Sequence, residues 1–140
     1  MPIRIKPPTL QDFILEKTDK EFENVGSPTT VRVRQATQGD EESRESLFNL
    51  TQTKFTNSGE RIQSNTLGMN DVWRREVFLT LSDCNIELEE GVRLFEFKNG
   101  KLVDENKFHD AWMKLDPIVA DEIIEKVHEL NTQWGPEGNK

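Results

Sequence analysis

The stretch that most constrains the fold is residues 108–134, which read FHDAWMKLDPIVADEIIEKVHELNTQW. Asp116 and Pro117 divide it, because Asp is a favoured N-cap and Pro is well tolerated at the first helical position. The pattern predicts two short helices that meet at this corner, each with one apolar face. The second helix should end at Asn131, since glycine and proline follow shortly after it. The apolar positions of the pair are Phe108, Ala111, Trp112, Leu115, Val119, Ala120, Ile123, Ile124, Val127 and Leu130.

A further helix is predicted over residues 72–84, where an Asn-Asp pair at 70–71 supplies the cap. Its Trp73, Val77 and Leu81 follow one another at intervals of four residues and therefore form one apolar stripe. This stripe needs another apolar surface to pack against, and the helix pair of the C-terminal third offers one.

The dipeptide Asn99-Gly100 lies between the apolar runs 93–97 and 101–103. Both residues tolerate the positive φ that a two-residue hairpin turn requires. The sequence therefore predicts a small central β-hairpin here, with Asp104 as the N-cap of the helix that follows.

Residues 29–35 alternate β-branched and charged side chains at a period of two, which is typical of a half-buried strand. Its simplest partner is the region around residues 13–22, which would complete an N-terminal hairpin. The pattern directs Thr29, Val31 and Val33 inward, and Arg32 and Arg34 outward.

The sequence predicts that the chain has two parts, an N-terminal arm and one domain. Residues 1–9 carry three prolines and should form an extended arm, ordered either not at all or by a neighbouring subunit. Residues 10–140 should form a single compact domain, with a helix capped by Asp40 and a polar loop at about 56–69. The expected fold class is α+β and mainly helical, with four helices, an N-terminal β-hairpin or strand and a small central hairpin.

Composition excludes several classes of function. The net charge of −8 argues against nucleic-acid binding, because phosphate contacts need a Lys/Arg surface. No long apolar run predicts a membrane span, and no signal-peptide pattern opens the chain, so we expect a cytosolic protein. The single cysteine, Cys84, cannot form an internal disulfide and is expected to be a small buried hydrophobe.

The residue types that carry chemistry are sparse. His109 and His128 are the only histidines, and both lie off the apolar stripes, so we expect them to be solvated. Residues 83–94 alternate oxygen-bearing side chains as a calcium loop does, but Leu88 stands where the turn requires Gly and Leu94 where a bidentate Glu is needed. The sequence therefore predicts no enzyme, no metal site and no cofactor. A small enzyme that uses scattered carboxylates, and an unrelated interaction module, are the remaining alternatives.

Two passages resemble the small tail assembly chaperones of long-tailed bacteriophages. The first is TTVRVRQATQGDEESRESLF, with its V-x-V-R-x-A-T-x-G-D run into a charged helix. The second is LFEFKNGKLVDENKFHDAWMKLDPIVADEIIEKVHELNTQW, with its F-x-x-A-W-x-x-L-x-P-x-x-A-x-x-I pattern and terminal N-x-x-W. The resemblance implies that Trp112, Leu115, Ile123 and Val127 are packing residues of the fold.

What the resemblance implies about function is an assembly role. Such a chaperone binds the helical tape measure protein in the cytoplasm of the bacterial host, before the tail tube polymerises. The alternative is a structural head-tail connector or tail adaptor subunit, which would be part of the virion. Expected partners are thus other phage structural or assembly proteins, such as the tape measure or tail tube protein. A homo-oligomer of this chain is a further option.

Two surfaces are candidates for partner binding. A groove for a partner helix needs an apolar channel with charge at its rim, and two stripes could form its walls: Trp73, Val77 and Leu81 on one side, and Val119, Ile123 and Val127 on the other. The alternative is that the two stripes bury each other. Arg32 and Arg34 form the second candidate, a docking surface for an acidic partner or for another copy of this acidic protein.

Overall fold

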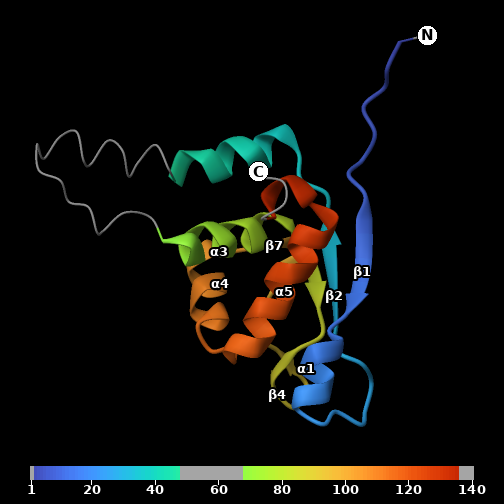
Figure 1. Ribbon diagram of the computed structural model, residues 1–140, viewed down its shortest axis with the longest axis vertical. Coiled ribbons are helices and arrows are strands. Elements are labelled where there is room, and N and C mark those ends of the chain that lie inside the picture. The colour runs from blue at the N-terminus through green and yellow to red at the C-terminus, as the bar shows by residue number, and fades with distance from the viewer. Residues whose placement is uncertain (1, 48–67, 136–140) are drawn as a thin grey trace, which may run out of the picture.

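The structure, a computed structural model, describes residues 2–47 and 68–135 of the chain (Figure 1). The described part contains five helices and three small antiparallel sheets, so the prediction of an α+β fold with substantial helix is confirmed. The sequence predicts four helices; the additional one is α1, Glu16–Glu21. Most of the polar loop predicted at about 56–69 lies outside the described residues.

The main sheet has three strands in the order β1-β2-β3. Strand β1, Leu10–Ile14, pairs antiparallel with β2, Thr30–Arg34. The partner predicted around residues 13–22 is therefore misplaced, because most of that region is helical. On the other side, β2 pairs antiparallel with β3, Leu81–Cys84, with a register shift between Arg32 and Val33. Val31 and Val33 are buried, at 2% and 0% exposure, and they give the sheet its apolar inner face.

Helix α1 connects β1 to the loop before β2, and its sequence, EKTDKE, gives it almost no apolar surface. The Glu122 carboxylate caps it instead, because Oε2 accepts from Lys17 N at 2.9 Å and Oε1 accepts from Thr18 N at 2.8 Å. Glu122 is 2% exposed. Its position off the predicted apolar stripe of residues 117–130 suggests a solvated side chain, but the cap at α1 buries it.

Residues 38–47 form a helix, whose first turn differs from the prediction. Thr37, not Asp40, is the capping residue: Thr37 Oγ1 accepts from Asp40 N at 3.3 Å, and Asp40 Oδ2 accepts from Thr37 N at 2.8 Å. This reciprocal pair is a capping box with Asp in the place of the usual Glu. Asp40 is thereby drawn into the protein, where it is 9% exposed.

Helix α3, Met69–Thr80, is shorter than the helix predicted over 72–84. The last four predicted residues form β3 instead, because Leu81 and Cys84 complete the sheet beside β2. The predicted cap at 70–71 is also misplaced, since the N-cap is Gly68. Tertiary pairing has overridden a helical pattern at the end of this segment.

Two small hairpins follow β3. The first joins β4, Glu87–Glu89, to β5, Val92–Arg93, and no pattern in the sequence predicts it. The second joins β6, Phe97–Lys98, to β7, Lys101–Leu102, through Asn99 and Gly100. Their φ angles of 55° and 74° are both positive, which is the turn that the Asn-Gly pair predicts.

The C-terminal helix pair has the predicted caps. Helix α4, Glu105–Trp112, begins at Asp104, whose carboxylate accepts from Asn106 N and Lys107 N. Helix α5, Pro117–Leu130, begins at Asp116, whose carboxylate accepts from Ile118 N. A short 3-10 helix, η2, covers Thr132–Trp134.

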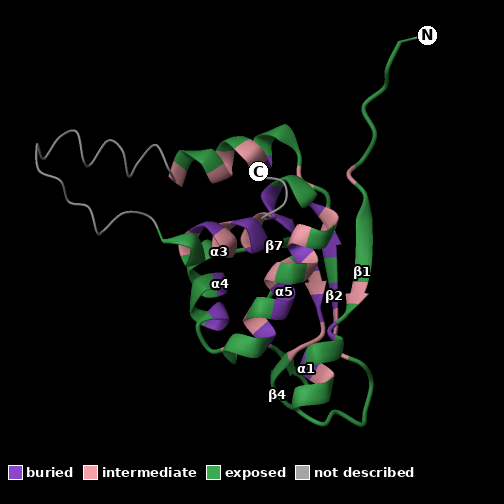
Figure 2. Cartoon of the chain, viewed as in Figure 1, coloured by how far each residue is buried: buried purple, intermediate pink, exposed green. Residues whose placement is uncertain are grey.

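The core lies where α5 packs between the sheet and helices α3 and α4 (Figures 1 and 2). The side chains of this core are buried and come from all of the larger elements. They include Leu15, Val31, Val33, Val77, Leu81, Phe95, Phe108, Trp112, Ile123, Val127 and Trp134. Asn131 ties the end of α5 to the chain after β2, since its side chain bonds Ala36 N at 2.8 Å and Arg34 O at 3.2 Å.

Candidate functional site

The apolar residues that the sequence proposes as walls of a binding channel lie inside the protein. Val77, Ile123 and Val127 are 0% exposed, and Leu81 is 1% exposed. Helices α3 and α5 contact each other, and these four side chains belong to one core. In this structure, the two stripes bury each other, which is the alternative that the sequence leaves open.

Two members of the proposed channel lie at its margins. Trp73 is half-buried on α3, with its ring 6.4 Å from the His128 ring in an edge arrangement. Val119 is 7% exposed at the start of α5, where it lines a surface groove. Of the six residues, Val119 is therefore the one that both packs in the core and faces a cavity.

The two arginines of the second candidate surface differ from each other. Arg32 is exposed, as predicted, and its Nε donates to Asp12 Oδ1 at 2.7 Å on the outer face of the sheet. Arg34 instead has a side chain only 15% exposed, in an ion pair with Asp40 at 2.8 Å and in a hydrogen bond to the Leu79 carbonyl. The expectation of an outward Arg34 is wrong, since β2 ends there and the 38–47 helix covers this residue.

An open groove lies at the end of the molecule formed by α1, the β4–β5 hairpin and the corner between α4 and α5 (Figure 1). It has a volume of about 780 Å³, within the range of pockets that hold ligands or peptide side chains. The apolar residues that line it are Phe22, Ile86, Leu88, Leu94, Leu115 and Val119.

Two of the apolar residues in this groove are well exposed: Phe22 at 52% and Leu88 at 53%. Ile86, Leu94 and Leu115 are partly buried and pack against the core behind them. An apolar floor that is continuous with the core, under exposed apolar walls, is the arrangement expected of a surface that binds another apolar chain.

Charge at the groove comes mainly from carboxylates. Asp19, Glu87 and Asp116 line it together with one cation, Lys114. Burial raises the pKa of Asp19, but hydrogen bonds from Thr29 and from the Asn24 amide outweigh it, so the pKa is lowered overall. The groove is thus apolar at its floor and mainly acidic at its edge.

Local bonds keep the groove walls in place. Thr29 N donates to Asp19 at 3.0 Å and Asn24 N donates to Asp19 O at 2.9 Å, which folds the loop after α1 back on itself. Asn85 joins that loop to the hairpin, since its Oδ1 accepts from Thr30 N and its Nδ2 donates to the Pro28 carbonyl, both at 2.9 Å. The Asn85 contacts join segments that lie 55 and 57 residues apart in the sequence, which explains why no local pattern reveals the groove.

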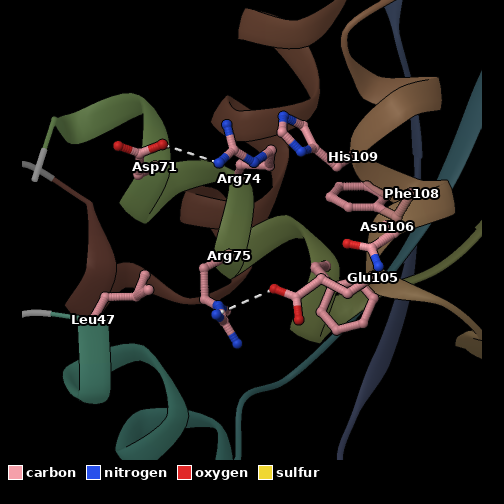
Figure 3. A pocket seen from close by; sticks show the side chains of 9 residues that line it. Leu47, Asp71, Arg74, Arg75, Glu105, Asn106, Phe108 and His109 are labelled. Atoms are coloured by element: carbon pink, nitrogen blue, oxygen red, sulfur yellow. Dashed lines mark hydrogen bonds and ion pairs between the residues drawn. The ribbon is translucent and has the colours of Figure 1, made fainter. Parts of the chain in front are cut away.

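A second, smaller pocket of about 220 Å³ lies between α3 and α4 (Figure 3). Each of its two arginines is engaged by a carboxylate: Arg74 by Asp71 at 2.9 Å, and Arg75 by Glu105 at 3.1 Å. His109 also lines it and is exposed, as predicted. Because Arg74 and Arg75 are already in ion pairs with carboxylates, this pocket is poorly suited to bind an anionic ligand.

One cluster has the residue types of acid–base chemistry. Glu76 is 0% exposed on α3, Arg44 Nε donates to one of its oxygens, and His128 Nε2 lies 2.7 Å from the other. The prediction that His128 is solvated is therefore wrong. Neither Glu76 nor His128 lines the groove or the pocket between α3 and α4. The cluster is placed to hold the 38–47 helix against α3 and α5.

Nucleophilic and metal chemistry find little support. Cys84 is buried in the core as expected, and burial raises the pKa of its thiol to about 11. A thiol with that pKa is a poor nucleophile near neutral pH. Among residues 2–47 and 68–135, no group of three or more His, Cys, Asp or Glu side chains is placed to hold a metal ion.

No helix in the described residues is long and apolar enough to cross a membrane. Comparisons of the chain with protein-family models, with curated proteins and with solved structures find no match.

Proposed function

We propose that this protein is a non-catalytic assembly chaperone of a long-tailed bacteriophage, and that it binds the tape measure protein before the tail tube polymerises. The observation that carries the proposal is the groove between α1, the β4–β5 hairpin and the α4–α5 corner, with exposed Phe22 and Leu88 above an apolar floor. The chaperone role itself comes from the sequence resemblance.

The groove suits a client of a particular kind. A helical segment with an apolar stripe can place that stripe on the groove floor and keep its polar side toward solvent. The carboxylates of Asp19, Glu87 and Asp116 at the edge favour basic residues beside the stripe. This arrangement supports an amphipathic, basic segment of the tape measure protein as the client.

Co-expression tests this proposal. The tape measure protein should be soluble when it is expressed with the wild-type protein and insoluble when it is expressed alone. Leu88→Asp should abolish that effect, because it places a charge where the client's apolar stripe would lie. Val103→Asp is the matched control, since Val103 is 49% exposed and does not line the groove. If the tape measure protein is equally soluble with both variants, the groove is not the site that binds it.

A connector or tail adaptor subunit is the second candidate, and one observation favours it. Residues 2–7 lie before β1 as an exposed arm, which suits a subunit that contacts a neighbour in an assembled particle (Figure 1). Mass spectrometry of purified particles separates the two functions. A connector should be present in a small symmetric copy number, whereas a chaperone should be absent.

A further inference from the structure

The N-terminal arm presents two apolar side chains to solvent. Ile3 and Ile5 are 99% and 101% exposed, and residues 2–7 all belong to the exposed class (Figure 2). Arg4 and Lys6 are the only charged residues between positions 2 and 9 of a chain whose net charge is −8. The arm is therefore apolar and basic, whereas the rest of the protein is strongly acidic.

The arm leads directly into a strand with an open edge. In the part of the chain that the structure describes, strand β1 pairs with β2 alone and is therefore an outer strand of its sheet. The residues that flank β1 direct their backbone groups to the β2 side: Thr9 O accepts from Gln35 N, and Leu15 N donates to Thr29 O, both at 2.8 Å. Both flanking residues have odd numbers. Because backbone groups alternate between the two sides of a strand, those of Leu10, Asp12 and Ile14 point to the open edge.

Strand β1 offers the arm an apolar contact on one face and a charge on the other. Phe13 lies on the inner face, packed against the core with Lys126 Nζ 5.8 Å from its ring centre. Asp12 lies on the outer face beside Arg32, between the exposed side chains of Leu10 and Ile14. In the arm, Ile3 and Ile5 alternate with Arg4 and Lys6, so an extended arm has one apolar face and one basic face.

We propose that residues 3–6 of a second copy of this protein add to the open edge of β1 as an antiparallel strand. The pairing places Ile5 opposite Phe13 on the inner face and Lys6 opposite Asp12 on the outer face. Lys6 and Arg4 supply the backbone donors opposite Asp12 and Ile14, whereas Leu10 falls opposite Pro8, which has no N–H. The exchange is reciprocal, so that each copy receives the other's arm about a two-fold axis near Thr9.

The arm of the same chain cannot take this place. The φ angles of Pro7 and Pro8 are fixed by their rings, and the Thr9 carbonyl accepts a hydrogen bond from Gln35 N beyond the end of β2. The arm therefore continues in the direction of β1. Figure 1 shows it running away from the domain as a continuation of the strand. A reversal onto its own edge would need a tight turn within these three residues.

The first test is the oligomeric state of the full chain by sedimentation equilibrium. The wild-type protein should dimerise with increasing concentration, and Ile5→Asp should weaken the dimer by about tenfold or more, since a buried isoleucine is lost from each of the two arms. Val25→Asp is the matched control, because Val25 is 100% exposed and lies outside the arm. A monomer up to millimolar concentration, or the same loss with both variants, would overturn the proposal.

The second test is a disulfide between two single-cysteine variants, in a chain whose buried Cys84 is replaced by Ala. Lys6→Cys mixed with Asp12→Cys should form a mixed disulfide under mild oxidation, because directly paired strand residues lie about 5.5 Å apart at Cα. Each variant alone should form far less. If Lys6→Cys joins Leu88→Cys instead, the arm enters the neighbour's groove and the strand pairing is wrong.

Discussion

Helix α5 contacts the rest of the protein differently along its length. In its middle, Ile123 and Val127 are 0% exposed and pack on α3 and the sheet. At its N-terminal end, Val119 is 7% exposed and faces an open groove. The first region is joined mainly by apolar side chains, with the His128–Glu76 contact beside them. In the second, α1 is attached through the Glu122 carboxylate, whose oxygens bond the backbone of Lys17 and Thr18.

This difference separates stability from binding. Apolar side chains that are buried between two elements stabilise the fold, and they are not accessible to a binding partner. Where α1 is attached to α5 by a helix cap, the neighbouring apolar side chains remain exposed to solvent. Phe22 and Leu88 are exposed by 52% and 53%. Substitutions in the first region should therefore unfold the protein, and substitutions in the second should leave it folded.

The largest effect is expected at Trp112, which is 9% exposed with its ring 5.8 Å from that of Phe108. Trp112→Ala should lower the free energy of unfolding by about 3–5 kcal/mol through the cavity it leaves. Urea denaturation measures this loss. Trp73→Ala makes the same change at a half-buried site and should cost clearly less; equal losses would contradict the placement of Trp112 in the core.

A smaller loss is expected at Asp40, which joins the 38–47 helix to Arg34. Burial raises the pKa of Asp40, but the Arg34 guanidinium and the hydrogen bonds from Thr37 outweigh it and the pKa is lowered. A carboxyl whose pKa is lower in the folded state stabilises the fold above its unfolded pKa, and this contribution disappears as pH falls through the folded pKa. Asp40→Asn should therefore cost about 1.5–3 kcal/mol at neutral pH, in line with hydrogen bonds to charged groups.

Acid titration checks the sign of that effect. The difference in unfolding free energy between the wild-type protein and Asp40→Asn should shrink as pH drops from 6 toward 2, because the wild-type carboxyl then becomes protonated. A difference that grows on acidification would show that Asp40 is not stabilised as an anion.

The joint between α1 and α5 gives the next effect. Glu122→Ala removes both acceptors at the start of α1 and should cost about 1–2 kcal/mol, as other helix caps do. Amide exchange should rise mainly in α1. Glu125→Ala, one turn position further along, removes only the exposed ion pair with Lys17 and should cost less than about 1 kcal/mol. Unchanged exchange in α1 with the first variant would mean that the cap does not hold this wall of the groove.

Local signals predict much of the fold. The caps at Asp104 and Asp116, the Asn99-Gly100 turn and strand β2 each depend on residues close together in sequence or on a two-residue alternation. The end of α3 could not be predicted in this way. Its Leu81 fits both the helical stripe and a strand, and only the presence of β2 beside it selects the strand.

The candidate site was largely hidden from sequence reasoning for the same reason. Glu122 follows the pattern of a solvated helix face, and its partners lie 104 and 105 residues away. His128 likewise appears solvated until Glu76 is placed 2.7 Å from it. The one local signal at the groove was apolar residues without a stripe, such as Phe22 and Leu88, in otherwise charged segments.

The smallest effect on stability is expected within the groove itself. Leu88 is 53% exposed in β4, so Leu88→Asp removes little buried area and should change the free energy of unfolding by about 0.5 kcal/mol or less. The same variant should no longer keep the tape measure protein soluble. Thermal unfolding of the variant alone, beside the co-expression assay, separates the two readouts. A large drop in melting temperature would place Leu88 among the residues that hold the fold, and the contrast between the two ends of α5 would then fail.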